Sequence, residues 1–200
     1  NGYFTSDMGH EEVISQMESA MGGRIVWANG KWRFLAGAWQ TPVSITLTED
    51  DLRSAPKLEC LVSRKDNFNS VRGTYSSAEK NFEVIDFPAV SVAAYVAEDN
   101  GDVVWEDFAL PFTTSGSMAQ RIARIELEEI RRNKTLTAKW GLKAYPLDIG
   151  DVVPVTIARY GFSAKTFRVV DYEYSWANGE PLVELTLRET DANVYSWTPA

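Results

Sequence analysis

The segment Leu110–Lys134 constrains the fold more than any other, because it is the longest helical pattern in a chain that otherwise reads as strands and turns. Ser117 and Gln120 have the spacing of a capping box, in which each side chain bonds the backbone of the other residue. The sequence therefore predicts a helix over residues 117–133. Its apolar residues recur on one helical face, which must cover a sheet: Ala119, Ile122, Ala123, Leu127 and Ile130.

Short strands are predicted on both sides of this helix, from runs of apolar and β-branched residues bounded by turn signals. Before the helix, we expect strands at 43–47, 57–63, 70–75, 90–97 and 103–108, the last two joined as a hairpin by the turn Asp99–Asp102. After the helix, we expect strands at 135–140, 152–158, 166–174 and 182–188. Asn178–Gly179 is expected to turn the last pair into a hairpin. Gly73 marks a bulge or a close approach of two backbones within its strand.

The N-terminal part predicts a small unit of one helix and one hairpin. The helix is expected over Glu11–Met21 and is stopped by Gly22–Gly23. Asn29–Gly30 is the preferred two-residue turn between the strand patterns RIVWA and KWRFL. A capped single helical turn is expected at 48–52, with acidic residues at its start.

The most suitable boundary between domains is the segment 54–56, where Pro56 follows two small residues. We therefore expect a small helix–hairpin subdomain at 1–54 and a β-rich, barrel-like domain at 55–200 that contains the helix 117–133. The predicted fold class is α+β and mainly β. It has a bent antiparallel sheet or a barrel packed with one long helix.

The charge of the chain excludes one class of function. With 28 acidic and 20 basic residues, the formal net charge is −8. A protein that holds nucleic acid by its phosphates needs clustered Lys and Arg, whereas an acidic surface lets DNA slide past without sticking. No apolar run approaches the roughly 20 residues needed to span a membrane.

Catalytic and metal-binding side chains are scarce. His10 is the single histidine, and we expect it at an exposed helix start. Cys60 is the single cysteine and is expected to be a small buried core residue, since it lies in an apolar run. These counts exclude an internal disulfide, a zinc site built from Cys or from a His cluster, and a triad that does not use His10. We predict no catalytic, no cofactor-binding and no metal-binding residue. The acidic segments 99–102 and 148–151 read as turns rather than calcium loops.

Several motifs in fixed order carry a resemblance to a known family. They are TLTEDDL (46–52), FNSVRGTY (68–75), DFPAV (86–90), AYVAEDNG (94–101), LPFTTS (110–115), AQRIA (119–123), GDVVPVTIARYGFSAKTFRVVD (150–171) and LRETDANVYSW (187–197). The chain resembles the phage tail proteins related to the central tail-tip, or J-type tail fibre, hub protein of siphophages. This module also occurs in prophages and gene transfer agents. The resemblance extends from about Val13 to Trp197.

The resemblance implies a structural role and no enzymatic activity. Proteins of this kind are similar to the baseplate hub proteins of contractile tails, whose barrel-like domains assemble as a homotrimer that closes the distal end of the tail tube. The implied partners are other tail-tip and tail-tube proteins. DNA is expected to pass through without specific binding, and the acidic composition fits a channel wall that repels phosphate. The implied location is the virion, at the phage tail tip, after synthesis in the bacterial host cytoplasm. Family members are long, so we expect this chain, which begins at Asn1, to be a segment of a longer polypeptide.

Two other functions stay open. One is a carbohydrate-binding or glycan-cleaving module on the host surface. It would need a cleft with adjacent exposed Trp or Tyr and, for cleavage, two carboxyl groups about 5–10 Å apart. The other is an adaptor domain of a secretion or injection machine. A hub module instead predicts broad contact surfaces and unpaired strand edges. Four aromatic residues near segment ends are candidates for a contact surface: Trp39, Trp176, Tyr195 and Trp197.

Overall fold

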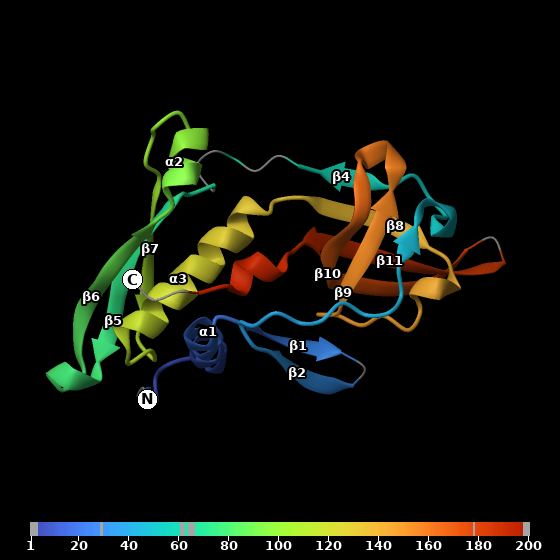
Figure 1. Cartoon of the computed structure of the whole chain (residues 1–200). Coiled ribbons are helices and arrows are strands. Elements are labelled where there is room, and N and C mark those ends of the chain that lie inside the picture. The colour runs from blue at the N-terminus through green and yellow to red at the C-terminus, as the bar shows by residue number, and fades with distance from the viewer. Residues whose placement is uncertain (1–3, 29, 61–62, 64–66, 178, 198–200) are drawn as a thin grey trace.

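Helix α3 (Gly116–Arg131) lies between two β-sheets in the computed structural model of the chain (Figure 1). The structure describes residues 4–28, 30–60, 63, 67–177 and 179–197. The predicted apolar face is confirmed, because Ala119, Ile122, Ala123 and Leu127 are buried and Ile130 packs against the same cluster. The helix thus forms the centre of the molecule, as its amphipathic pattern predicts.

The start of this helix differs from the prediction. The N-cap residue is Ser115, and its side chain accepts no capping hydrogen bond from the helix. The Gln120 side chain does not return to the backbone of Ser117, because it donates a hydrogen bond to the carbonyl oxygen of Pro88 (3.1 Å). The predicted capping box is therefore wrong, and a contact distant in sequence has replaced the local one.

The smaller sheet covers one side of α3 and has the strand order β6–β5–β7 (Figure 1). Its strands are β5 (Ser70–Ser77), β6 (Glu83–Ser91) and β7 (Trp105–Leu110). Strand β5 pairs antiparallel with β6 and parallel with β7. Between this sheet and α3 lies a separate apolar core of Phe68, Val71, Phe87 and Leu110, together with the buried face of the helix.

The predicted hairpin of strands 90–97 and 103–108 is wrong. Residues Ala93–Glu98 form helix α2, and β7 pairs in parallel with β5. Alanines 93, 94 and 97 favour a helix, which the strand interpretation overlooked. The antiparallel partner of β5 is β6, which was only partly predicted. Pro88 lies within it and is tolerated because β6 is an edge strand.

The larger sheet has the order β3–β9–β10–β11–β8–β4. Its long strands are β8 (Thr135–Trp140), β9 (Val152–Ile157), β10 (Phe162–Ala177) and β11 (Glu180–Glu189), which pair antiparallel with one another, whereas the short strand β3 pairs in parallel with β9. Strand β3 (Leu47–Thr48) pairs with β9 at one edge, and β4 (Lys57–Glu59) pairs with β8 at the other.

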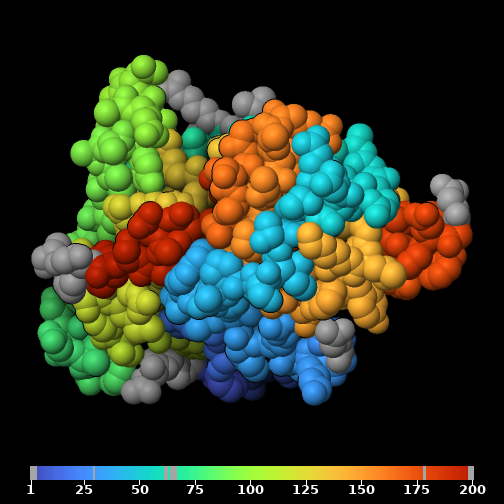
Figure 2. All heavy atoms as spheres, turned by 45° about the vertical axis from the view of Figure 1, so that its right-hand side comes forward, coloured from blue at the N-terminus to red at the C-terminus, as the bar shows by residue number. Residues whose placement is uncertain are grey.

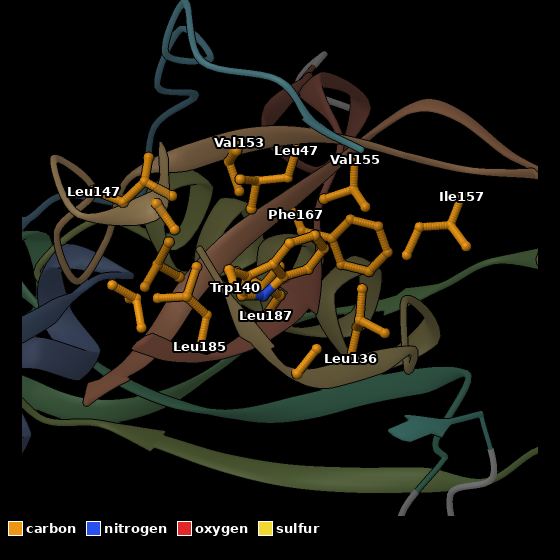
Figure 3. Close-up of a cluster of buried hydrophobic side chains, with 14 of the residues drawn as sticks. Leu47, Leu136, Trp140, Leu147, Val153, Val155, Ile157, Phe167, Leu185 and Leu187 are labelled. Carbon is orange, nitrogen blue, oxygen red and sulfur yellow. The ribbon is translucent and has the colours of Figure 1, made fainter. Parts of the chain in front are cut away.

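This sheet curls around its own core, in which side chains of β3, β8, β9, β10 and β11 pack in one buried cluster (Figure 3). Trp140, Phe167 and Leu187 are fully buried there and come from three strands. The two outermost strands, β3 and β4, do not pair with each other in the part of the chain that the structure describes. Of the two alternatives predicted, the bent sheet is therefore observed, and the described strands form no closed barrel.

A small helix–hairpin unit lies beside α3 and the larger sheet (Figure 1). It consists of α1 (His10–Met21), β1 (Arg24–Ala28) and β2 (Lys31–Leu35). Gly22 adopts the left-handed conformation (φ 57°) and ends α1, as predicted. Asn29 and Asn178, each the first residue of a predicted hairpin turn, lie outside the described residues. The described residues contain five short 3₁₀ helices: η1 (Glu49–Asp51), η2 (Ala78–Lys80), η3 (Leu142–Ala144), η4 (Ala158–Tyr160) and η5 (Ala192–Tyr195).

Other local predictions have mixed outcomes. The capped turn at 48–52 is confirmed by η1, since the Thr48 hydroxyl and backbone N–H both bond to the Asp51 carboxylate. The expected strand 43–47 is reduced to β3, and residues 61 and 62 of the strand 57–63 lie outside the described residues. Cys60 is exposed, so the prediction of a buried core thiol is wrong. The fold class, α+β and mainly β, is confirmed, and the division at residue 54 stays a prediction.

Candidate assembly surfaces

The hairpin β1–β2 has an apolar outer face that nothing in the described chain covers fully. Trp27 and Trp32 are cross-strand partners, and Ile25 is paired with Phe34 on the same face. The side chains of Trp27, Trp32 and Phe34 are 55%, 63% and 70% exposed. The two indole rings pack edge to face with their centroids 5.0 Å apart. Large aromatic residues gathered on one exposed face are typical of a contact surface.

The inner face of the same hairpin is anchored to the turn before β9. Arg33 donates hydrogen bonds to the Asp148 carboxylate (2.7 Å) and the Ile149 carbonyl oxygen (3.1 Å), and it reaches the Asp151 carboxylate at 3.5 Å. Leu35 is buried against Gly150, where a Cβ atom would lie 2.6 Å from the leucine side chain. The hairpin is therefore held with its aromatic face outward (Figure 2, blue).

Strand β6 lies at one edge of the smaller sheet. Among the described strands, only β5 pairs with it, so its outer side is unpaired. Val84 on this strand and Phe82 just before it are 67% and 52% exposed. Glu83 and Asp86 bring negative charge to the edge, and Pro88 lacks a backbone donor, which limits non-specific pairing with other strands. The edge remains available for a partner of suitable shape.

A network of charged and tyrosine side chains joins α3 to helix α2, strand β10 and the 3₁₀ helix η5. Glu128 is buried and is bonded by Tyr95 (2.6 Å) and Arg132 (2.7 Å), and Arg124 pairs with it as well. Burial alone would raise the pKa of the Glu128 carboxyl, but these hydrogen bonds and charges leave its pKa below the ordinary value. Burial and the Glu128 hydrogen bond raise the pKa of Tyr95.

Glu129, the next residue of the helix, accepts hydrogen bonds from Arg168 (3.3 Å) and from the Tyr195 hydroxyl (3.1 Å). Arg168 also bonds to Tyr195. Burial raises the pKa of Glu126, and the neighbouring charge of Glu129 raises it further. These contacts connect α3 with β10 and η5, so the network holds the helix to the larger sheet rather than forming an open site.

The aromatic residues singled out from the sequence have different environments. Trp176 is 65% exposed near the end of β10. Trp39 and Tyr195 are half-buried and pack against each other with ring centroids 6.3 Å apart. Trp197 is half-buried and lines a shallow hollow beside Gln120. The exposed residues of the β1–β2 hairpin were not predicted as a surface, although the alternation of Trp32 and Phe34 around Arg33 was the signal that could have found them.

Chemistry that needs a metal or a nucleophile finds little support in the described chain. Its described residues contain no group of three or more His, Cys, Asp or Glu side chains that could hold a metal ion. His10 is exposed at the first position of α1, as predicted. The segments 99–102 and 148–151 are turns whose carboxylates Asp99 and Asp148 bind Arg131 and Arg33. No helix in the described residues is long and apolar enough to cross a membrane.

The fold is that of phage tail proteins. A chain in the structure "Virion of native gene transfer agent (GTA) particle" superimposes with a TM-score of 0.73 at 20% identity, covering 98% of this chain and 42% of that one. The 43 kDa tail protein of prophage MuSo2 from Shewanella oneidensis gives 0.59 at 14% identity, over 92% of this chain and 54% of that chain. The tail protein from Neisseria meningitidis MC58 gives 0.62 at 15%, over 88% and 53%.

The chain belongs to the family described as "putative phage tail protein", whose family model matches residues 10–171. This confirms the family that the sequence motifs indicate. The chain spans about half the length of the solved chains that it resembles. No curated protein matches the sequence.

Proposed function

We propose that this phage tail component is a part of the central hub at the tail tip of a phage or prophage. In this role it assembles as a homotrimer around the distal end of the tail tube, where the particle attaches to its host and DNA leaves. The observation that carries the proposal is the outward aromatic face of the β1–β2 hairpin, fixed from behind by Arg33. The proposed location is the virion, after synthesis in the host cytoplasm.

The size of this face supports a protein contact. A fully buried aromatic side chain covers about 150–250 Å². Because Trp27, Trp32 and Phe34 are each more than half exposed, they present roughly 300–450 Å² of mostly apolar surface. A specific interface buries about 800 Å² on each partner, so this face would supply around half of one side.

The symmetry of the proposed assembly follows from the two different contact surfaces on each copy. The aromatic hairpin face and the open β6 edge belong to different parts of the molecule (Figure 1). A contact between unlike surfaces of neighbouring copies is heterologous and produces a ring where the rotation closes. A closed trimer around the end of a tube has this arrangement. Remaining surface would contact other tail-tip and tail-tube proteins.

DNA passes such a ring without specific binding in this proposal. The net charge of −8 supports it, because a surface without clustered basic residues offers phosphates no site. The chain should bind duplex DNA more weakly than about 10⁻⁴ M at physiological salt. A trimer whose lumen is lined mostly by Lys and Arg would contradict this part of the proposal.

We further propose that the chain is not an enzyme. The carboxylates of Asp148 and Asp151, in the turn before β9, both face the guanidinium of Arg33. Glycoside hydrolysis needs two carboxyl groups that flank the scissile bond, and two carboxylates that both bind one arginine do not have this arrangement. Release of reducing ends from host glycans by the purified chain would refute this statement.

Imaging of intact particles tests the location directly. Antibodies raised against residues 4–197 should label the distal end of the tail in electron micrographs. Label along the tube, on the head or nowhere on the particle would contradict the proposal. Finding the protein in a non-viral secretion or injection machine would favour the adaptor function instead.

A further inference from the structure

A hollow lined by three tyrosines lies at the base of the β10–β11 hairpin. It has a volume of about 610 Å³ and is open to solvent. One wall comes from η3 and the residues after it, with Leu142 and Tyr145, and the other from β10, with Tyr172 and Tyr174. Figure 2 shows segment 142–148 (yellow-orange) beside the projecting hairpin. The volume is within the range of small-ligand sites.

The aromatic walls are held in place before any ligand arrives. The Tyr172 hydroxyl donates a hydrogen bond to the Tyr145 carbonyl oxygen (3.3 Å) and so ties the two walls together. The rings of Tyr145 and Tyr174 meet at 73° with centroids 5.7 Å apart. Both side chains are about half exposed, at 58% and 47%. The hollow therefore presents two ring surfaces at a steep angle, with hydroxyl groups at their ends.

This arrangement matches the two-sided chemistry of a sugar ring. A pyranose has an apolar face of C–H groups and a rim of hydroxyls. Tyrosine provides a rigid apolar face together with a polar tip at small entropic cost. Asp148 supplies a carboxylate on the rim, which can accept hydrogen bonds from sugar hydroxyls while it also binds Arg33.

The charges around the hollow select the kind of sugar. None of its lining residues is Lys or Arg, and the nearby Arg33 is bound by Asp148 and Asp151. Burial raises the pKa of Tyr172, and the neighbouring Tyr145, Tyr174 and Asp148 raise it further, as expected where negative charge is unfavourable. An anionic sugar would therefore be repelled, and a neutral one accepted.

The aromatic surface continues beyond the hollow. Tyr172, Tyr174 and Trp176 occupy alternate positions of β10, so all three side chains lie on one face of the strand. Trp176 is 65% exposed on the projecting part of the hairpin. A ligand longer than one ring can rest on this row, which favours an oligosaccharide over a monosaccharide.

We propose that the hollow between the η3 segment and β10 binds a neutral oligosaccharide, with Tyr145 and Tyr174 stacking on one sugar ring and Trp176 on a following one. The chain holds this ligand and does not cleave it. The inference does not depend on the tail-tip position or on trimer formation, because the site is complete within one copy.

Binding of the purified chain to an array of neutral and anionic bacterial oligosaccharides tests the proposal. We expect binding to at least one neutral glycan, and Tyr145→Ala and Tyr174→Ala should each weaken it by about tenfold or more. Tyr174→Phe keeps the ring and should stay within about threefold of the unsubstituted chain. Trp105→Ala removes a partly exposed indole from the smaller sheet and should bind normally.

Three results would overturn the proposal. They are the absence of binding to every neutral glycan, a preference for anionic glycans, and binding that persists in the Tyr145→Ala/Tyr174→Ala double variant. Quenching of tryptophan fluorescence by the bound glycan gives a second readout, and it should disappear in Trp176→Phe. If Tyr174→Ala assembles into particles normally but loses glycan binding, the sugar site and the assembly function are separate, as proposed.

Discussion

Gly73 shows how a single residue sets the spacing of two strands. A Cβ atom at this position would lie 1.8 Å from the carbonyl oxygen of Phe108 on β7, and the register of β5 with β6 shifts next to it. The bulge or close approach predicted from the sequence is therefore confirmed in both respects. This feature could be predicted from the sequence, because a glycine within a strand pattern by itself indicates a bulge or a close backbone approach.

Replacing this glycine should separate β5 from β7. We expect Gly73→Ala to destabilise the chain by about 2 kcal/mol or more, because backbone must move to admit the methyl group. For a chain of this size that lowers the melting temperature by roughly 4–8 °C, measurable by calorimetry. Gly141→Ala is the matched control, since its added methyl meets only the flexible end of Arg53. Equal effects of both substitutions would contradict the argument.

Arg33 illustrates a contact that the sequence cannot reveal. Its partners Asp148 and Asp151 lie 115 and 118 residues further along the chain. The alternation of the hairpin indicates that Arg33 points away from Trp32, but nothing local tells which face meets the body of the protein. Only the folded arrangement decides that the aromatic residues face solvent.

Loss of this arginine should release the hairpin. Arg33→Gln is expected to cost about 1 kcal/mol of global stability, discounted for the partial exposure of the ion pairs. The larger effect should be faster hydrogen exchange at the amides of β1 and β2, since their anchor to the turn 148–151 is removed. Lys31→Gln makes the same charge change within the hairpin and serves as control. Unchanged protection in Arg33→Gln would show that Leu35 alone suffices as the anchor.

At the scale of elements, regular patterns are predictable and competing contacts are not. The helix α3 and strand β8 follow their sequence patterns closely because their buried faces have a clear period. The N-terminal cap of the helix was misplaced, because Gln120 bonds to Pro88 on β6 instead of to the backbone at the start of the helix. Segment 93–98 was misassigned because apolar residues such as Tyr95 and Val96 fit a strand and a helix alike.

Helix α3 also carries two carboxylates with opposite effects on stability. The pKa of Glu128 is below its ordinary value of 4.5, so the unfolded chain takes up this proton first as the pH falls. The stability that Glu128 contributes is therefore present above about pH 4.5 and lost at lower pH. Glu128→Gln should destabilise the chain at pH 7 and flatten the acid side of its stability curve in urea titrations.

Glu126 on the same helix should behave in the opposite way. Burial raises its pKa above 4.5, so the folded chain takes up the proton first and the ionised group is unfavourable at neutral pH. Glu126→Gln is expected to stabilise the chain at pH 7, and the gain should disappear as the pH falls to about 4.5. The two variants are matched in chemistry and position. Stability changes of the same sign in both would refute the assignment.

At the scale of the whole molecule, the family could be recognised from motifs, whereas the surfaces could not. The motifs are concentrated in segments that build the sheets and α3. The residues proposed for assembly, by contrast, project from a hairpin whose anchor is distant in sequence. The tyrosine hollow likewise joins Tyr145 to Tyr172, which are 27 residues apart. Such surfaces depend on tertiary structure, so the local periodicity of hydrophobic residues does not predict them.

The last prediction concerns assembly of the hub. Trp32→Ser and Phe34→Ser should each weaken association between copies, since large aromatic residues at the centre of an interface commonly contribute 2 kcal/mol or more. That corresponds to a loss of about thirtyfold in affinity. Native mass spectrometry of the purified protein would measure the trimer fraction, and electron microscopy would count intact tails. Trp105→Ser, which removes an indole from another surface, should assemble normally. If the Trp32 and Phe34 variants also form trimers at the unsubstituted level, the hairpin face must have a different partner, and the proposed ring would need another interface.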